Sequence, residues 1–514
     1  MKKLTDDEIM ARLSEPNGAE KLVNMNVDTD AMLESAVRLF CERGAASALL
    51  LRLANKKRHL IAMTGDERLI ASLKEALTGD TPKLRRNAAR LIGTIKAEGC
   101  ADALMEALDA EPQRFVRPSM ILALGSIGGE KAAEYLKNYR VAPAADETEQ
   151  KHFNEESDAL TLALRSFVPR EAHEFLGLSH SFAIELLCPD MLTHQLEEEL
   201  GDIGLEAYDV RRSSLKVNTG DYPALFEARC FREALFVISQ GVDFTPEAIA
   251  KKAAPYLKEL MRSCHSGKPP YRFRVELGVE CPDRAKVVRD IASSVECAEL
   301  LNAPSDYEVE LRIEGNVRFC RLYAKLFTFK DTRFSYRAES IPASMDPSVA
   351  AAVLRLAQDY LGVNARVIDP CCGSGTFLIE RGLLSPCKSL TGVDIAHHAI
   401  DAARRNTALS GVDAKYTVND ILRFVCHRPY DELICNLPFG NRVGTHSSCE
   451  SLYKGLLNRL PELVKKGGVA ILYTMEFTLL KKLITQCGER VTLLSQHRTE
   501  AGGLTPMIFI LRVN

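Results

Sequence analysis

The stretch RVIDPCCGSGT, residues 366–376, decides the fold of the C-terminal part of the chain. An apolar strand runs into a glycine bend there, and the helical sequence TFLIERGLL follows at once. A Gly-x-Gly bend lets a ligand approach the backbone, and a helix N-terminus offers free N–H groups to a carboxylate or phosphate. A glycine bend alone is as often a plain tight turn, so the neighbouring residues must decide between the two.

The flanking segments extend this strand and helix into an α/β domain. From about Pro347, helical and strand-like sequences alternate in the order AAAVLRLAQDYL, RVIDPCC, TFLIERGLL, SLTGVDI, AHHAIDAARRNTALSG and AKYTVND. Alternation of helices with apolar strands is typical of a doubly wound parallel sheet of the Rossmann-like kind. Ligands of such sheets bind at the carboxyl ends of the strands, where the glycine bend is expected.

Two acidic residues follow the next strands at that edge. Asp394 ends the sequence Gly392-Val-Asp, nineteen positions beyond Gly375, and can accept both hydroxyls of a ribose. The third glycine of a dinucleotide fingerprint would stand at Leu378, so S-adenosylmethionine is favoured over a nicotinamide. Asp420 closes the following strand and can accept the amine of an adenine, although an N-cap explains it equally well.

The sequence Asn436-Leu437-Pro438-Phe439 ends the fourth strand. The Asn436 side-chain oxygen and the Leu437 carbonyl can accept the two N–H groups of an exocyclic amine, and Phe439 can stack on a base. Such an amine loses its proton after methyl transfer, so positioning and electrostatics supply the rate without a strong base. We therefore expect these four residues to be catalytic.

These motifs carry a family resemblance. DPCCGSGT, GVD, ND and NLPFG, in this order, resemble class I S-adenosylmethionine-dependent methyltransferases that modify exocyclic amines. The closer resemblance is to the RNA methylase family of the UPF0020 type, which includes THUMP-containing guanosine-N2 methyltransferases of tRNA. It covers residues 302–514 well, where IPASMDPSVAAAVLRL is similar to the family's lead-in, and residues 182–301 only faintly.

The resemblance implies a cofactor, a target and a set of site residues. The cofactor is S-adenosylmethionine, and the target is N2 of guanosine in an RNA, either tRNA or rRNA. The implied cofactor-binding residues are Ser344, Asp369, Cys371, Gly373, Ser374, Gly375, Thr376, Asp394, Ile395, Asp420, Ile421 and Asn436.

Before residue 140 the chain repeats itself at an offset of thirty-two residues. Leu84-Arg85 align with Val116-Arg117, and Gly93 aligns with Gly125. Each unit is expected to form two amphipathic helices, in a pattern that resembles HEAT repeats. Such pairs must stack to bury their apolar faces, so further repeats are expected around residues 32–53 and 132–167. Residues 141–157, VAPAADETEQKHFNEES, are expected to be an exposed excursion, and a plain helical bundle is the alternative for the region.

The chain is therefore expected to be multidomain, with three parts. Residues 1–170 form an α-helical HEAT-like solenoid, which is foreign to the family's usual layout and could bind a protein partner. Residues 171–340 form an α+β adaptor, because strand-like segments such as FAIELL and RFRVEL alternate with helices; the resemblance makes it THUMP-like or ferredoxin-like and RNA-binding. Residues 341–514 form the α/β Rossmann-like class I methyltransferase.

The charge balance requires that RNA be held locally. The 66 Lys and Arg residues stand against 69 Asp and Glu residues, a net charge of -3, so the whole molecule does not attract nucleic acid. The candidate RNA-binding patch lies between residues 312 and 337, where basic and aromatic residues are interleaved. The alternative is that these residues belong to an edge strand that faces solvent. The basic members of the patch are Arg312, Arg318, Arg321, Lys325, Lys330, Arg333 and Arg337.

Other patterns exclude classes of protein. No apolar run approaches the ~18 residues of a membrane span, and the first residues lack an apolar signal segment. Fifteen cysteines without a CxxC pair fit neither a disulfide framework nor a zinc site. A cytoplasmic location without membrane or metal partners is therefore expected.

Three alternatives to RNA methylation remain at this stage. Methylation of DNA adenine N6 or of a protein glutamine uses a similar Asn-x-Pro-aromatic turn. A non-catalytic scaffold, in which the repeats bind a partner, is the third. The intact Asp394, Asn436 and Phe439 argue against the scaffold.

Overall fold

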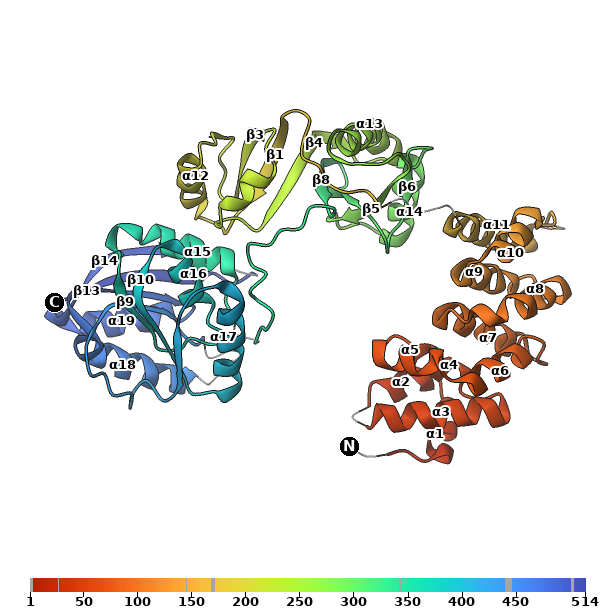
Figure 1. Ribbon diagram of the computed structural model, residues 1–514, viewed down its shortest axis with the longest axis horizontal. Helices are drawn as coiled ribbons and strands as arrows, with labels where there is room; N and C mark the ends of the chain where they lie inside the picture. Colours follow the sequence, from red (N-terminus) through yellow and green to blue (C-terminus); the bar gives the residue numbers. More distant parts are fainter. Residues whose placement is uncertain are drawn as a thin grey trace. The chain divides into compact units, whose positions relative to one another are not determined.

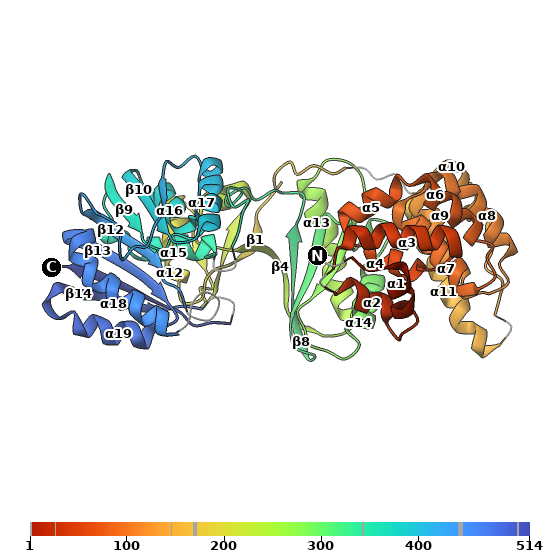
Figure 2. The same ribbon diagram turned by 90° about the horizontal axis from the view of Figure 1, so that it is seen from below.

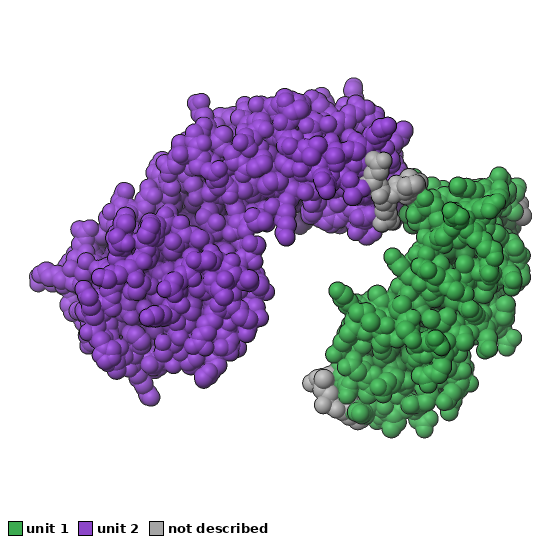
Figure 3. Space-filling model, viewed as in Figure 1, with its two compact units in different colours: residues 1–170 green, residues 171–514 purple. Residues whose placement is uncertain are grey.

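The computed structural model of the chain describes residues 3–25, 27–144, 146–167, 172–341, 344–439, 446–500 and 503–514. It divides into two compact units, Met1–Arg170 and Glu171–Asn514 (Figure 3). The expected boundary at residue 170 lies outside the described residues. No division falls at residue 340 within the described chain: the second unit continues across it, and one hydrophobic core contains residues from both sides.

The first unit is built from helices (Figure 1). Two of the pairs, α6 with α7 and α8 with α9, are those predicted from the repeated sequence. The elements are α1 (Asp6–Leu13), α2 (Gly18–Val23), α3 (Thr29–Arg43), α4 (Ser47–Leu53), α5 (Lys57–Thr64), α6 (Glu67–Ala76), α7 (Pro82–Ile95), η1 (Glu98–Cys100), α8 (Ala101–Ala110), α9 (Arg117–Ile127), α10 (Glu130–Asn138) and α11 (Glu147–Ser166).

Equivalent glycines set the packing between successive repeats. A Cβ on Gly93 of α7 would lie 3.0 Å from a backbone Cα of α9, and a Cβ on Gly125 of α9 would lie 2.7 Å from a Cα of α11. The Ser126 hydroxyl donates to the Gly93 carbonyl at 2.7 Å, and the Ser166 hydroxyl donates to the Gly125 carbonyl at 2.6 Å. The same contact recurs one repeat later, which is the geometry of a stacked solenoid and not of a plain bundle.

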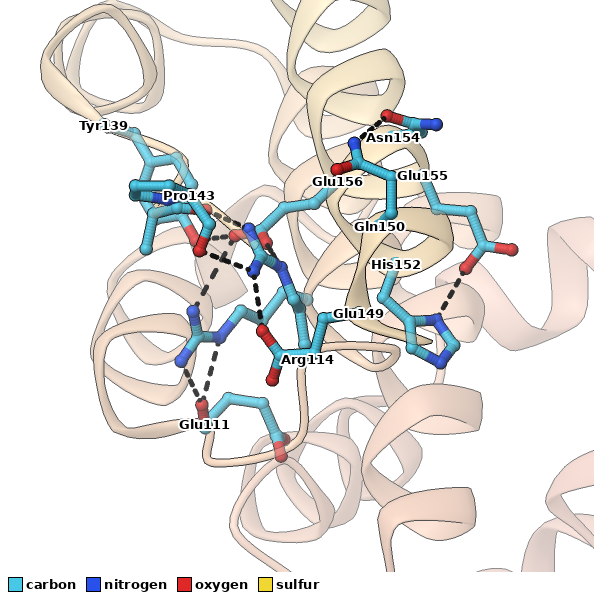
Figure 4. Close-up of polar contacts among 12 residues, drawn as sticks. Glu111, Arg114, Tyr139, Pro143, Glu149, Gln150, His152, Asn154, Glu155 and Glu156 are labelled. Carbon is cyan, nitrogen blue, oxygen red and sulfur yellow. Dashed lines mark hydrogen bonds and ion pairs between the residues drawn. The ribbon is translucent and has the colours of Figure 1, made fainter. Parts of the chain in front are cut away.

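Arginines at the aligned positions hold the ends of these helices. Arg85 donates two hydrogen bonds of 2.8 Å to the Glu111 carboxylate. One repeat later Arg117 donates to the Glu111 carbonyl at 3.1 and 2.9 Å. Arg114 binds the buried Glu156 carboxylate of α11 at 2.8 Å, as Figure 4 shows. Charge-assisted bonds of this kind join each repeat to the next.

Residues 141–157 differ from the expected exposed excursion. From Glu147 onward they belong to α11, and within them Glu156 is fully buried. The prediction was wrong for this part, because the polar composition hides a helix whose buried carboxylate is ion-paired.

The middle region of the second unit is an eight-stranded sheet with helices, the expected α+β class. The strand order is β2-β3-β1-β4-β8-β7-β5-β6; β5 runs parallel to β6 and β7, and β4 pairs antiparallel with β8 (Figure 2). The elements are β1 (Phe182–Leu187), α12 (Thr193–Asp202), β2 (Ala207–Tyr208), β3 (Ser214–Thr219), η2 (Pro223–Glu227), β4 (Glu233–Asp243), α13 (Pro246–Cys264), β5 (Tyr271–Leu277), α14 (Arg284–Val295), β6 (Leu300–Asn302), β7 (Val309–Gly315) and β8 (Phe319–Leu326).

The C-terminal region is a seven-stranded α/β sheet in the order β11-β10-β9-β12-β13-β15-β14. The first five strands in this order are parallel, as a doubly wound sheet requires, whereas β14 and β15 form an antiparallel edge that the sequence did not predict. The elements are α15 (Pro347–Leu356), η3 (Gln358–Tyr360), β9 (Ala365–Asp369), α16 (Thr376–Leu384), β10 (Cys387–Asp394), α17 (His397–Ser410), β11 (Lys415–Val418), β12 (Tyr430–Asn436), α18 (His446–Leu463), β13 (Val464–Thr474), α19 (Phe477–Gln486), η4 (Gly488–Arg490), β14 (Val491–Arg498) and β15 (Met507–Val513).

Helices cover both faces of this sheet. α15, α16 and α17 lie on one face, and α18 and α19 lie on the other (Figure 1). Successive residues of β12 serve the two layers: Ile434 packs in the core that contains Phe377 of α16, and Leu433 packs in the core that contains Leu456 of α18. Because the middles of the strands are covered on both faces by apolar layers, polar residues that bind a ligand must stand at the strand ends.

Ion pairs join the middle region to the α/β region. Arg229, which precedes β4, binds the buried Glu380 of α16 through two hydrogen bonds of 2.8 and 2.9 Å. The Tyr336 hydroxyl donates to the same carboxylate at 2.6 Å. Arg355 of α15 also lies 3.8 Å from Glu198 of α12. These contacts fix α16, and the glycine turn before it, to the middle region.

Within the described ranges, no helix combines the length and the apolar character needed to cross a bilayer.

Candidate active site

Three predicted site residues end three neighbouring strands. Asp369 is the last residue of β9, Asp394 the last of β10 and Asn436 the last of β12. β9 lies between β10 and β12, so the strands that follow β9 along the chain are first added on one side of it, as β10 and β11, and then on the other, as β12 and β13. Doubly wound sheets bind their ligands in the crevice at such a switch point.

The glycine turn opens the N-terminus of α16. Gly373 and Gly375 have φ angles of 52° and 83°, in the left-handed region that favours glycine. A Cβ on Gly375 would lie 2.7 Å from the Tyr416 hydroxyl, so a side chain has no room there. No side chain caps α16, and the buried Thr376 hydroxyl has no hydrogen-bond partner among the described residues. The turn therefore offers donors to an anionic group.

The two acids beside the turn have different surroundings. Asp394 accepts the N–H groups of Gly373 at 3.0 Å and Ala396 at 2.9 Å, which leaves lone pairs on both oxygens for hydroxyl donors. Asp369 is buried, and burial raises its pKa to about 8; the Cys371 N–H at 3.1 Å opposes the rise and the charge of Asp394 adds to it. Asp394 is thus suited to bind a ligand, and Asp369 is suited to hold the turn.

Ser344 joins the lead-in segment to the glycine turn. Its hydroxyl lies 2.8 Å from the Ser374 hydroxyl and accepts the Ile341 N–H at 2.8 Å. The buried Asn406 of α17 donates to the Ser374 carbonyl at 3.0 Å. The segment before α15 therefore forms one wall of the site.

The other residues that the family resemblance implies for cofactor binding differ in their exposure to solvent. Ile395 is 71% exposed beside Asp394, so its side chain is free to cover a planar ligand. Asp420 accepts the Leu422 N–H at 2.9 Å and keeps part of its carboxylate exposed. A turn and not a helix follows Asp420, so its alternative role as an N-cap is wrong. The Ile421 side chain lies in the hydrophobic core, which leaves only its backbone for the site, and Cys371 is half-buried.

The Asn436–Phe439 segment is anchored by two tyrosines. The Leu437 N–H donates to the Tyr473 carbonyl at 2.9 Å, and the Tyr453 hydroxyl donates to the Pro438 carbonyl at 2.7 Å. The Phe439 ring lies 6.1 Å from the Tyr473 ring. The Pro438 carbonyl is thereby turned into the protein, while Asn436 stays half-buried at the strand end. Gly440, quoted with this motif, lies outside the described residues.

Sequence reasoning missed both tyrosines. Tyr453 comes from α18 and Tyr473 from β13, and neither belongs to a local motif. Their role follows from the tertiary contact alone.

Three of the seven basic residues between positions 312 and 337 are paired with carboxylates. Arg312 and Lys325 both bind Glu233, each at 2.5 Å, and Arg333 is buried and binds Asp331 at 2.8 Å. β8 lies between β4 and β7, so it is not an edge strand either. The prediction of a continuous phosphate-tracking strip is wrong for these three side chains. Arg318, Arg321 and Lys330 are exposed, and Arg337 is half-buried.

The described residues hold no cluster of three His, Cys, Asp or Glu side chains that could bind a metal ion.

Comparisons with known proteins address both ends of the chain. Residues 335–499 match the family of RMKL-like methyltransferase domains, UPF0020, and residues 70–150 match HEAT repeats. The prediction of HEAT-like repeats is thereby confirmed for residues 70–150. The match to a methyltransferase domain falls on the α/β region.

Two curated relatives carry related names. The tRNA (guanine(6)-N2)-methyltransferase of Thermus thermophilus is 29% identical over 177 residues, which are 34% of this chain and 51% of that protein. The tRNA (guanine(10)-N2)-dimethyltransferase of Methanothermobacter thermautotrophicus is 27% identical over 162 residues, 31% of this chain and 46% of that protein. The chain thus spans about half the length of these relatives.

A solved structure shows the same fold. SMU.472, described as a putative methyltransferase complexed with SAH, has a TM-score of 0.54 and 15% sequence identity over 66% of this chain and 99% of its own. At this identity the likeness supports the fold alone.

Proposed function

We propose that the chain, whose residues 335–499 form an RMKL-like methyltransferase domain, is an enzyme that transfers a methyl group from S-adenosylmethionine to N2 of a guanosine in tRNA or rRNA. One observation carries the proposal. The glycine turn, Asp394 and the Asn436–Phe439 segment meet at the carboxyl ends of neighbouring strands. The names of the relatives support the choice of guanosine N2.

The residues of the turn fit the proposed cofactor. The uncapped N-terminus of α16 and the Thr376 hydroxyl suit a methionine carboxylate, and Asp394 suits the ribose hydroxyls. Ile395 suits the adenine face, with Asp420 toward its amine. When bound, this cofactor supplies an electrophilic methyl group.

The chain's own contribution to catalysis is orientation. The Asn436 side-chain oxygen and the Leu437 carbonyl accept the two N–H groups of the target amine, which aims the nitrogen lone pair at the methyl donor. Phe439 stacks on the base. Because the Tyr453 and Tyr473 contacts fix the segment beforehand, little reorganisation is needed in the transition state. The amine releases its proton to solvent after transfer.

The other parts of the chain choose the RNA in this proposal. Residues 171–340 act as a THUMP-like, RNA-binding adaptor, and residues 1–170 dock an RNA or a protein partner through their repeats. Residues 341–514 perform the transfer. The Arg229–Glu380 pair supports the adaptor role, because it holds the middle region at a fixed place on α16.

A labelling experiment tests the proposal. The full-length protein is incubated with methyl-labelled cofactor and, separately, with total RNA, DNA and protein pools, and each labelled pool is digested. We expect label in N2-methylguanosine from RNA. Label in N6-methyl-2′-deoxyadenosine from DNA or in methylglutamine from protein would replace the proposed substrate, and the absence of label in every pool would support the scaffold.

A further inference from the structure

A cavity of about 400 Å³ lies where the middle region, the linker and α15 meet. Arg232, the residue before β4, lines one wall. Phe334 and Arg337 come from the linker after β8, and Asp346 and Ser348 come from the start of α15. None of the expected catalytic or cofactor residues lines this cavity.

The cavity holds uncompensated positive charge. Arg337 is half-buried, and its Nε atom is buried without a hydrogen bond among the described residues. Arg232 forms a long ion pair, in which its Nε atom lies 3.9 Å from Asp346 Oδ2. The other carboxylate oxygen of Asp346 caps α15, at 2.9 Å from the Ser348 N–H.

The two arginines that contact Phe334 are each paired with a carboxylate, whereas the buried Arg337 Nε atom has no hydrogen bond among the described residues. Arg333 binds Asp331 at 2.8 Å, and Arg229 binds Glu380 at 2.8 Å. A buried guanidinium donor that lacks an acceptor is costly, so such a group is expected to meet an anion when the protein works. Arginine is also the side chain best shaped to grip a phosphate.

The cavity has an apolar wall as well. The Cζ atoms of Arg229 and Arg333 each lie 4.9 Å from the centroid of the Phe334 ring. These contacts fix the ring in place. A fixed aromatic beside two arginines suits a sugar–phosphate group better than a free inorganic ion.

The cavity also lies beside the candidate active site. Burial raises the pKa of the Tyr473 hydroxyl; the charge of Arg232 opposes the rise and that of Asp346 adds to it. Tyr473 in turn contacts Phe439, with ring centroids 6.1 Å apart. On the other side, Asp346 follows Ser344, which contacts the glycine turn, by two residues.

We infer that this cavity binds a backbone phosphate of the RNA strand next to the methylated guanosine, with Arg337 and Arg232 as its donors. The inference rests on the proposed function and names a positioning site for it. A phosphate gripped here holds the strand while the base enters the Asn436–Phe439 segment. Arg337 and Arg232 are therefore positioning residues, not catalytic ones.

The test compares full-length variants that each lose one positive charge. Arg337→Gln and Arg232→Gln remove the proposed donors, and Arg337→Lys keeps the charge at the first position. Arg289→Gln is the matched control, because Arg289 is exposed on α14 of the same unit. Binding of a fluorescent pool of unmodified tRNA transcripts is measured at several salt concentrations, together with kcat, KM and the affinity for S-adenosylhomocysteine.

We expect Arg337→Gln to weaken RNA binding roughly tenfold and to reduce the slope of log K against log salt by about 0.7 to 0.9, the value for one phosphate contact. KM should rise more than kcat falls, S-adenosylhomocysteine affinity should stay unchanged, and Arg337→Lys should restore the slope. Arg289→Gln should behave as the wild type.

Several outcomes would overturn the inference. If the wild type methylates RNA and Arg337→Gln matches Arg289→Gln in affinity and salt slope, the cavity does not hold a phosphate, although the proposed function stands. If Arg337→Gln instead weakens S-adenosylhomocysteine binding, the arginine serves the cofactor. A wild type that binds duplex DNA or protein but no RNA would remove the proposed function and this inference together.

Discussion

We propose that Asn436 acts through the position of its side-chain oxygen, and a variant tests this. Asn436→Ala removes one acceptor for the target amine and leaves the glycine turn and Asp394 intact. Turnover should fall by a factor on the order of 10²–10³, as for other preorganised polar contacts. The affinity for S-adenosylhomocysteine, measured by calorimetry, should barely change. Undiminished transfer to RNA would show that the amine is held elsewhere.

Asp394→Ala is expected to weaken cofactor binding, which Asn436→Ala should leave unchanged. Its carboxylate belongs to the cofactor side of the crevice, where loss of a partner for buried ligand hydroxyls costs about 1–3 kcal/mol. Cofactor affinity should fall by that amount, and RNA affinity should be kept. Equal effects of the two variants on both ligands would mean that the two sides of the crevice are not separate.

Asp369 should make the free protein less stable as the pH rises. Its pKa is about 8 in the folded protein and has an ordinary value of 3.8. Between these values the unfolded chain has released a proton that the folded chain retains, so the free energy of unfolding decreases with pH. Below the lower value both states are protonated and the penalty vanishes.

The variant Asp369→Asn tests whether the free energy of unfolding decreases with pH because of this carboxyl group. Asparagine keeps an oxygen for the Cys371 N–H and cannot ionise. The melting temperature of the variant relative to the wild type should rise from about pH 4 to about pH 8 and then level off. The exposed Asp413→Asn is the control, with no such trend. A difference that does not depend on pH would contradict the buried neutral carboxyl.

At the scale of elements, the stacking of α7, α9 and α11 depends on small residues. Gly125→Ala places a Cβ 2.7 Å from a Cα of α11, so the two helices must separate, at a cost of about 1–3 kcal/mol. Hydrogen exchange should become faster in α9 and α11. Gly99→Ala, whose Cβ would lie 4.0 Å from its nearest neighbour, should change stability by no more than about 0.5 kcal/mol. Equal exchange in both variants would contradict close helix packing.

The elements also show how far sequence alone predicts this protein. Helices α6 to α9 and strands β9 to β12 carry their own periodicity and glycines, so their existence and order were predictable. The start of α11 was not predictable, because residues 147–157 read as an acidic loop and the buried Glu156 there is explained by a tertiary contact with Arg114. The contacts that hold the Asn436–Phe439 segment were not predictable either, since Tyr453 and Pro438 lie fifteen residues apart in the sequence.

At the scale of the whole molecule, the buried pair of Arg229 and Glu380 decides where the chain can be divided. The two residues lie 151 positions apart. A cut before residue 302 would remove Arg229 and break its pair with Glu380; if the carboxylate stays buried, loss of its partner costs about 3–5 kcal/mol. That is a large part of the roughly 5–15 kcal/mol that stabilises a typical domain. The methyltransferase region should therefore not fold well without the middle region.

Two fragments test this division. Residues 172–514 keep the ion pair and the shared core, so this fragment should unfold cooperatively and bind S-adenosylhomocysteine as tightly as the full chain. Residues 302–514 should be less stable and bind more weakly, as circular dichroism and calorimetry would show. If the shorter fragment proves as stable as the longer one, the buried pair does not couple the two regions.

The longer fragment also tests the repeats. If they choose the substrate, residues 172–514 should methylate the guanosine of many RNAs at similar rates, whereas the full chain should prefer a subset of the same pool. The ratio of kcat/KM between preferred and other RNAs measures this preference, and it cancels any loss of active protein in the fragment. An unchanged ratio would mean that the methyltransferase and middle regions recognise the RNA by themselves, and that the repeats bind something other than the substrate.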